Sequence, residues 1–129
     1  MSNTTGQYAS SVWARLPFGP SWNSKNKKEQ RKLLKEAIAL TSLATVKLDP
    51  SATFTLMLTF RSNLWYTRTG TVRRVDLLNL TKVLEDEIAR ALGYDDSRNF
   101  DVVLQKRELR FPTDEEHVSV LLATRPSGR

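Results

Sequence analysis

Charged and amide side chains with regular spacing are concentrated between residues 73 and 106. Asn79, Lys82 and Asp86 are three or four residues apart, so on a helix they lie within about 60° of one another. Apolar residues gather on the opposite side of the same helix: Leu77, Leu80, Leu84, Ile88 and Ala91. A helix with this pattern buries its leucines and presents to solvent a line of groups suited to a metal ion and a phosphate.

Acidic residues also lie at both ends of this predicted helix. Asp76 opens it, and the pair Asp95 and Asp96 follows Gly93, the expected left-handed terminator. Two or three carboxylates can hold Mg²⁺ together with water, and bound Mg²⁺ activates water for attack on a phosphodiester. The two ends are about 25 Å apart along the helix. A single metal site therefore requires that the Asp95-Asp96 loop folds back or that a partner subunit supplies one end.

This segment resembles the RusA family of Holliday junction resolvases (crossover junction endodeoxyribonucleases). The family helix reads roughly D-x-D-N-x-x-K-x-x-x-D and is followed by D-D and a later lysine; the matching positions are Asp76, Asn79, Lys82, Asp86, Asp95, Asp96 and Lys106. A second stretch, LPFGPSWN at residues 16–23, is similar to the family's N-terminal L-P-x-x-P-S-x-N turn. The likeness spans residues 12–124. One position departs from it, because the family's second helical aspartate is Leu78 here.

The resemblance implies a homodimeric endonuclease that resolves four-way DNA junctions in recombination and repair. Asp76 and Asp96 are then the metal ligands, with Mg²⁺ as the cofactor and Mn²⁺ as an alternative. Lys82 stabilises charge at the scissile phosphate, and Asp95 and Asp86 complete the predicted catalytic set. No organic cofactor is expected. Leu78 supports a different interpretation, a branched-DNA-binding protein that kept the fold and lost catalysis with its metal ligand.

Basic residues predict how DNA would be held. Side chains that can neutralise phosphates or line the site form one predicted nucleic-acid-binding set: Lys25, Lys27, Lys28, Arg31, Arg73, Arg74, Asn79, Arg98 and Lys106. Contacts of this kind fix position on the backbone without reading sequence. Trp65 and Tyr66 can stack on unpaired bases at a junction, although burial in the core is the commoner role of such aromatic residues.

Composition limits the other functions. The 129 residues carry a formal charge of +6 with a pI of about 9.9, which favours an anionic partner. There are no cysteines and one histidine, His117, so disulfides, thiolate metal sites and histidine-rich metal sites are excluded. No apolar run is long enough to span a membrane and the N-terminus does not read as a signal peptide, so we expect a cytoplasmic protein without a membrane partner.

Simpler interpretations exist for each part of the pattern. Asp76 can be a helix N-cap, Lys82 and Asp86 can be an exposed i,i+4 ion pair, and Asp95-Asp96 after glycine can be an ordinary turn. An unrelated basic domain that binds RNA is a third class, and it would show no preference for branched DNA. The order and spacing of the whole set favour the nuclease.

The remaining pattern predicts a single small α+β domain, a mixed sheet with two main helices, over residues 11–125. We expect strands at 11–16, 52–60, 100–109 and 117–124, with 63–68 as a further strand or an irregular edge. The first helix should be capped by Asn23 or Ser24 and run to about Leu43, with Leu40 facing the core. Residues 1–10 are predicted to be disordered and 126–129 to form a loose tail.

Overall fold

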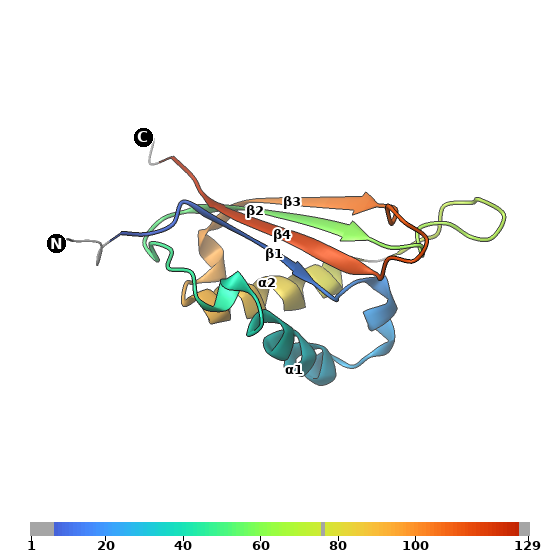
Figure 1. The fold of residues 1–129 in the computed structure, drawn as a ribbon, viewed down its shortest axis with the longest axis horizontal. Helices are drawn as coiled ribbons and strands as arrows, with labels where there is room; N and C mark the ends of the chain where they lie inside the picture. Colours follow the sequence, from blue (N-terminus) through green and yellow to red (C-terminus); the bar gives the residue numbers. More distant parts are fainter. Residues whose placement is uncertain (1–6, 76, 127–129) are drawn as a thin grey trace.

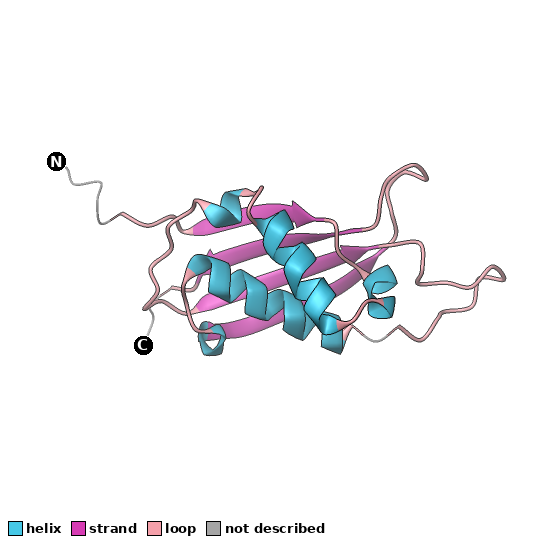
Figure 2. Cartoon of the chain, turned by 90° about the horizontal axis from the view of Figure 1, so that it is seen from below, coloured by secondary structure: helices cyan, strands magenta, loops and turns pink. Residues whose placement is uncertain are grey.

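The protein forms one mixed sheet with both helices on the same face (Figures 1 and 2). The computed structural model describes residues 7–75 and 77–126. Its strands are β1 (Ser11–Leu16), β2 (Phe54–Arg61), β3 (Asn99–Arg107) and β4 (His117–Thr124), in the order β1-β4-β2-β3. β2 and β3 are parallel, and the other two pairings are antiparallel. The small single-domain α+β architecture predicted from the sequence is confirmed.

Alternating side chains of the strands build the core against α1 (Lys27–Ile38) and α2 (Leu78–Leu92). In β2 every second residue is buried, and the same alternation appears in β1. The largest wholly buried side chains come from both layers and include Leu16, Leu34, Phe54, Phe60, Leu84 and Ile88. Ala91, expected on this buried side of α2, is exposed. The core therefore lies between the helices and one sheet face and leaves the other face to solvent.

The first helix differs from its prediction at both ends. It starts at Lys27, after Asn26, whose side-chain oxygen accepts from the Glu29 backbone N–H at 2.8 Å. It ends at Ile38, because the Thr41 hydroxyl donates to the Ile38 carbonyl at 2.8 Å and opens the short 3-10 helix Ser42–Ala44. Leu40 is consequently 90% exposed and does not face the core. Competition from side-chain hydrogen bonds shortened this helix.

A crossover through α2 joins the parallel strands β2 and β3. Because the two strands are parallel, α2 runs against both of them. Its first residue, Leu78, therefore lies at the carboxyl ends of β2 and β3, and its last turn lies at the opposite end of the sheet (Figure 1). Gly93 ends the helix with φ +76° and ψ +31°, as predicted. The helix starts two residues later than expected, and Asp76 lies outside the described residues.

The segment between β2 and α2 projects beyond the sheet as a narrow hairpin, the arm (residues 65–73; Figures 1 and 2). The Arg73 backbone N–H donates to the Trp65 carbonyl at 2.7 Å, and the Thr67 N–H donates to the Thr71 carbonyl at 2.8 Å. Gly70 supplies the positive φ (+85°) that the tip requires. The 63–68 segment is therefore an irregular edge, and its one isolated bridge among the described residues joins Tyr66 to Val72.

Backbone hydrogen bonds hold the first described residues against a neighbouring loop and against β4. The Ala9 N–H donates to the Lys47 carbonyl and the Thr124 N–H donates to the Ser10 carbonyl, each at 2.8 Å. The rest of the predicted disordered N-terminus and loose tail, residues 1–6 and 127–129, lies outside the described residues. Within the described chain, no helix has the length and apolar character needed to cross a membrane.

Candidate functional site

The exposed side of α2 carries the predicted line of polar groups. Asn79 and Lys82 are exposed, and Asp86 is half-buried one turn further on. Leu78 is the first residue of the helix and has 72% of its surface exposed. The leucines Leu80 and Leu84 are wholly buried on the other side. The sequence pattern therefore gives the correct orientation of this helix.

Asp96 reaches back across the helix terminus to meet Asp86. After Gly93 the chain turns into the short 3-10 helix Asp96–Arg98, and the carboxyl groups of Asp96 and Asp86 share a hydrogen bond. That bond, together with burial and the charges of Asp86, Glu85 and Asp95, raises the pKa of Asp96. Two residues separated by the helix terminus thus form one carboxyl pair.

Asp86 is the anionic member of this pair. Burial acts to raise the pKa of Asp86, but hydrogen bonds from Asp96 and Arg31 and the charges of Arg31 and Lys82 outweigh it, so the pKa is lowered. Lys82 therefore lies close enough to act electrostatically on the pair. The structure brings together Lys82, Asp86 and Asp96, three members of the predicted catalytic set.

Asp95 has a different partner from its neighbour. Its side chain caps the 3-10 helix by accepting from the Ser97 N–H at 2.9 Å. This backbone hydrogen bond is the main reason why the pKa of Asp95 is lowered. Asp95 thus supports the turn that presents Asp96, and it lines the same open hollow of about 390 Å³ as Asp86 and Asp96.

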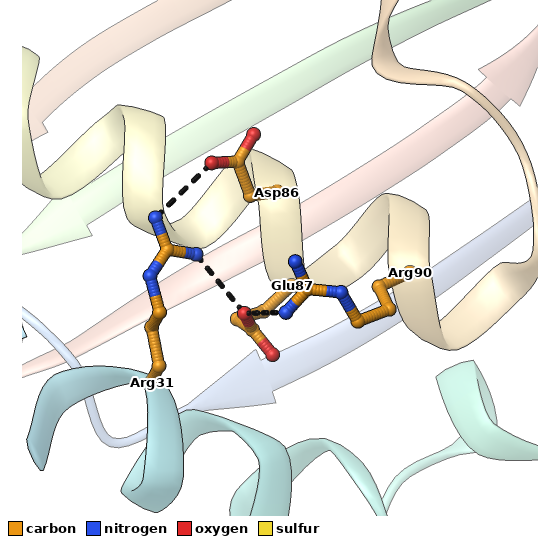
Figure 3. Close-up of polar contacts among 4 residues, drawn as sticks. All are labelled: Arg31, Asp86, Glu87 and Arg90. Carbon is orange, nitrogen blue, oxygen red and sulfur yellow. Dashed lines mark hydrogen bonds and ion pairs between the residues drawn. The ribbon is translucent and has the colours of Figure 1, made fainter. Parts of the chain in front are cut away.

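Arg31 links Asp86, one member of the carboxyl pair, to α1 (Figure 3). Its guanidinium donates to Asp86 Oδ2 at 3.2 Å and to Glu87 Oε2 at 3.0 Å. Arg90 completes the cluster by donating to Glu87 at 2.6 Å, and the Glu87 side chain is only 2% exposed. The guanidinium of Arg31, predicted to contact DNA phosphate, is therefore engaged by two carboxylates.

A second chain of hydrogen bonds, which the sequence pattern did not reveal, supports the same end of the helix. The Tyr94 hydroxyl donates to Asn99 Oδ1 at 2.9 Å, and Asn99 Nδ2 donates to Glu85 Oε2 at 2.9 Å. Burial raises the pKa of Tyr94 to about 12, so this phenol keeps its proton as a donor across the physiological range. The signal available in the sequence was only the tyrosine that directly follows Gly93.

Basic residues gather at the other end of the helix. α1 and α2 both begin at the end of the sheet where β2 stops (Figure 1). Lys25, Lys27 and Lys28 lie at the start of α1, and Arg73 and Arg74 lie just before α2. Lys106 joins them from β3, with its Nζ 3.5 Å from the Val75 carbonyl. Seven of the nine predicted nucleic-acid-binding residues, these six and Asn79, thus lie toward one end.

Arg98, which is half-buried, lies apart from these cations. It belongs to the 3-10 helix that carries Asp96, and its guanidinium donates to the Ser51 carbonyl at 2.7 Å. It therefore lies at the acidic end of α2, and its hydrogen bond holds the Asp95–Asp96 turn against the loop before β2.

The N-terminal motif has a structural partner far along the chain. Ser21 donates through its backbone N–H and its hydroxyl to the Glu116 carboxylate, and the Ser62 hydroxyl donates to Glu116 Oε1 at 2.8 Å. A Cβ at Gly19 would lie 2.6 Å from Glu116 Cγ, so glycine is needed for this approach. The motif fixes the turn after β1 to the loop before β4.

No single-chain metal cage is visible in the described part of the protein, where no three carboxylate or histidine side chains converge on one point. The pair Asp86 and Asp96 faces an open hollow, which suits a cation that keeps several waters and takes one or two protein carboxylates. His117 is 5% exposed, and its Nδ1 lies 2.8 Å from the Glu115 carbonyl. It takes no part in this site.

Comparison with known proteins gives little beyond this geometry. No protein-family model matches the chain, and no curated protein matches its sequence. Among solved structures, it is similar to two structures of 2C-methyl-D-erythritol-2,4-cyclodiphosphate synthase, one titled as the CDP-bound form. Both have a TM-score of 0.30, with 21% and 19% identity over 74% and 84% of this chain. The chain spans 51% and 58% of theirs, and nothing further is drawn from so low a score.

Proposed function

We propose that the protein is a Mg²⁺-dependent, structure-specific endonuclease of the RusA type that resolves four-way DNA junctions by phosphodiester hydrolysis. One observation carries the proposal: Asp96 folds back onto Asp86, on the exposed side of α2 that also presents Lys82. These are positions of the family-like motif that are separated by a helix terminus in sequence. Ordinary turn chemistry explains Asp95, but it does not require that Asp96 form a carboxyl pair with a mid-helix aspartate.

The roles of the residues follow from this arrangement. Asp96 and Asp76 hold the Mg²⁺ ion, with Mn²⁺ as an alternative, and the bound ion supplies an activated water and relief of phosphate charge. Lys82 stabilises the negative charge that develops on the phosphate. Asp86 fixes Asp96, and Asp95 fixes the turn below it. The cations at the start of both helices bind the DNA backbone.

The position of Asp96 favours ligands from two chains. Asp96 lies beside Asp86, which is eight residues and about 12 Å along the axis from Leu78. Asp76 of the same chain precedes Leu78, so one ion cannot readily contact both Asp76 and Asp96 of that chain. A homodimer that supplies Asp76 from one subunit and Asp96 from the other avoids this problem. Its two-fold symmetry also suits paired cuts in a four-way junction.

The uncovered face of the sheet offers a further surface for self-association, separate from a shared metal site, because α2 and its carboxyl pair lie on the opposite face. Trp13, Leu121, Met57 and Val103 are direct neighbours across all the strands and point away from the helices. Trp13 is 57% exposed and Leu121 is 37% exposed. A continuous apolar row of this kind favours burial against a second copy of the chain. Sedimentation of the wild type and of Trp13→Lys tests this, and a monomeric wild type would contradict it.

Cleavage of a labelled four-way junction tests the function. The wild type should give paired nicks in Mg²⁺ or Mn²⁺ on the junction and none on a linear duplex of the same sequence. Asp96→Asn should abolish the nicks and leave junction binding in place. Cutting of linear DNA to the same extent, or cutting that survives Asp96→Asn, would rule out the proposed site.

A non-catalytic junction-binding protein is the second candidate, favoured by Leu78 in place of the family's aspartate. Such a protein binds junctions equally well with and without Mg²⁺ and cuts in neither metal. Leu78→Asp distinguishes the two candidates, because the side chain is 72% exposed and an acidic residue suits the first turn of a helix. Cleavage that appears only in Leu78→Asp would identify the natural protein as the binding form.

A further inference from the structure

A hollow of about 310 Å³ lies between the arm and the end of β3. Aromatic, basic and acidic side chains line it: Trp65, Tyr66, Val72, Arg73, Lys106, Arg107 and Glu108. It lies at the carboxyl ends of the parallel strands β2 and β3, where α/β sheets commonly bind ligands. None of its aromatic residues belongs to the proposed catalytic set.

The floor of the hollow is held rigidly. Trp65 is 5% exposed, and its indole N–H donates to the Arg107 carbonyl at 2.6 Å. The Lys106 ammonium lies 5.4 Å from the centre of the Trp65 ring, in cation–π contact. Trp65 therefore fixes the base of the arm against β3 and positions one cation over the hollow.

The wall of the hollow exposes a flat apolar surface. Tyr66 is 45% exposed and Val72, its bridge partner across the arm, is 71% exposed. Arg73 and Lys106 lie beside this pair in the same lining. An aromatic ring flanked by cations suits a ligand that is both planar and anionic, and a nucleotide has both properties. Bases within a duplex are stacked on both sides, so only an unpaired base can lie on Tyr66.

We propose that this hollow binds an unpaired nucleotide, with its base stacked on Tyr66 and its phosphate held by Arg73 and Lys106. This inference rests on the proposed function, because the unpaired bases are those at the centre of a branched DNA. It identifies these bases as the part of the substrate that the arm recognises. The binding requires neither the carboxyl pair nor a metal ion.

Binding of single strands without metal tests the inference. A labelled oligothymidylate of about ten nucleotides is compared, in the presence of a chelator, with the same backbone carrying abasic sites. The wild type should bind the oligothymidylate about tenfold more tightly than the abasic strand, and this ratio of affinities corresponds to one stacked base. Tyr66→Leu should reduce this ratio to near one and leave binding of the abasic strand unchanged.

Matched variants separate stacking from charge and from folding. Tyr8→Leu removes a tyrosine that is 50% exposed outside the hollow and should keep the wild-type ratio. Lys106→Gln should weaken the binding of both strands equally and lower the slope of log K against log salt by about one. A tenfold ratio that persists in a folded Tyr66→Leu, or equal wild-type affinity for both strands, overturns the inference.

The outcome is independent of cleavage. Asp96→Asn should retain the tenfold ratio, since its carboxylate is not part of the hollow. An enzyme that cuts junctions but shows no such ratio would refute this inference alone. A protein that shows the ratio but never cuts would refute the nuclease and leave the nucleotide site standing.

Discussion

The two ends of α2 carry opposite charges, and each is placed against the helix dipole. Cations gather at its beginning, where the dipole favours anions, and the first turn contains no acidic residue among those described. Asp86, Asp95 and Asp96 gather toward its end, where the dipole favours cations. Among the described residues, Arg90 in the last turn and Arg98 just beyond the helix follow the stabilising preference. The helix dipole therefore does not explain these positions, and Asp86 and Asp95 are held instead by hydrogen bonds from Arg31 and from the Ser97 N–H.

The largest expected effect tests whether one metal site takes Asp76 from one subunit and Asp96 from the other. Mixed dimers of Asp76→Asn and Asp96→Asn chains contain one intact site if each site takes its ligands from two chains. They should nick one strand of a junction, whereas each parent dimer should be inactive. Strand-specific gel analysis of the mixture measures this. Inactive mixed dimers, with exchange of subunits verified, would place both ligands in one chain.

The ion-pair cluster at the acidic end gives the next effect. Glu87→Gln leaves Arg31 and Arg90 without their shared carboxylate and should destabilise the fold by about 2 kcal/mol, below the usual cost for a fully buried pair because both arginines are partly exposed. Urea denaturation measures this change. Glu36→Gln, at an exposed position of α1, serves as the control and should change stability little.

The basic end should show a smaller effect that depends on salt. Arg73→Gln and Arg74→Gln should each weaken junction binding several-fold and lower the slope of log K against log salt by about one. Stability should be unchanged because both residues are exposed. Binding titrations at a series of salt concentrations measure the slope, and an unchanged slope in both variants would exclude phosphate contact at this end.

The smallest effect concerns Tyr94. One phenol should titrate at about 12, detected by its absorbance in the ultraviolet, and Tyr94→Phe should remove it. The unfolded chain releases this proton near pH 10, whereas the folded chain keeps it until about 12. Stability from this group is therefore complete below pH 10 and is lost as the pH rises toward 12. A titration curve that shows no phenol near 12 would contradict the buried position of Tyr94.

Local patterns in the sequence predicted most of the elements, because each depends on neighbouring residues. The alternation in β2, the leucine side of α2 and the terminator Gly93 all have this origin. The first helix was predicted too long because Leu40 extends the apolar spacing, while the cap at Thr41 opposes it through hydrogen bonds. The spacing of apolar residues alone does not reveal this competition between helix extension and side-chain hydrogen bonds.

The assembly of the candidate site could be predicted only in part. The motif selected Lys82, Asp86 and Asp96, and the structure brings these three together. The contact between Arg31 and Asp86 joins α1 to α2 across 55 positions of sequence, so no local pattern reveals it. The roles of Tyr94, Asn99 and Glu116 depend on tertiary contacts in the same way. Isolated cations are easily assigned to DNA when their carboxylate partners are distant in sequence.

The strand order also determines when the sheet can form during synthesis. β4 lies between β1 and β2, so these two strands make no ladder with each other and both depend on residues 117–124. A nascent chain of which only the part up to α2 has left the ribosome still lacks β4, the strand that joins β1 to β2. Folding must wait for the late strand, and such long-range pairing is slow. Until then the apolar faces of β1 and β2 stay accessible to chaperones and to other nascent chains.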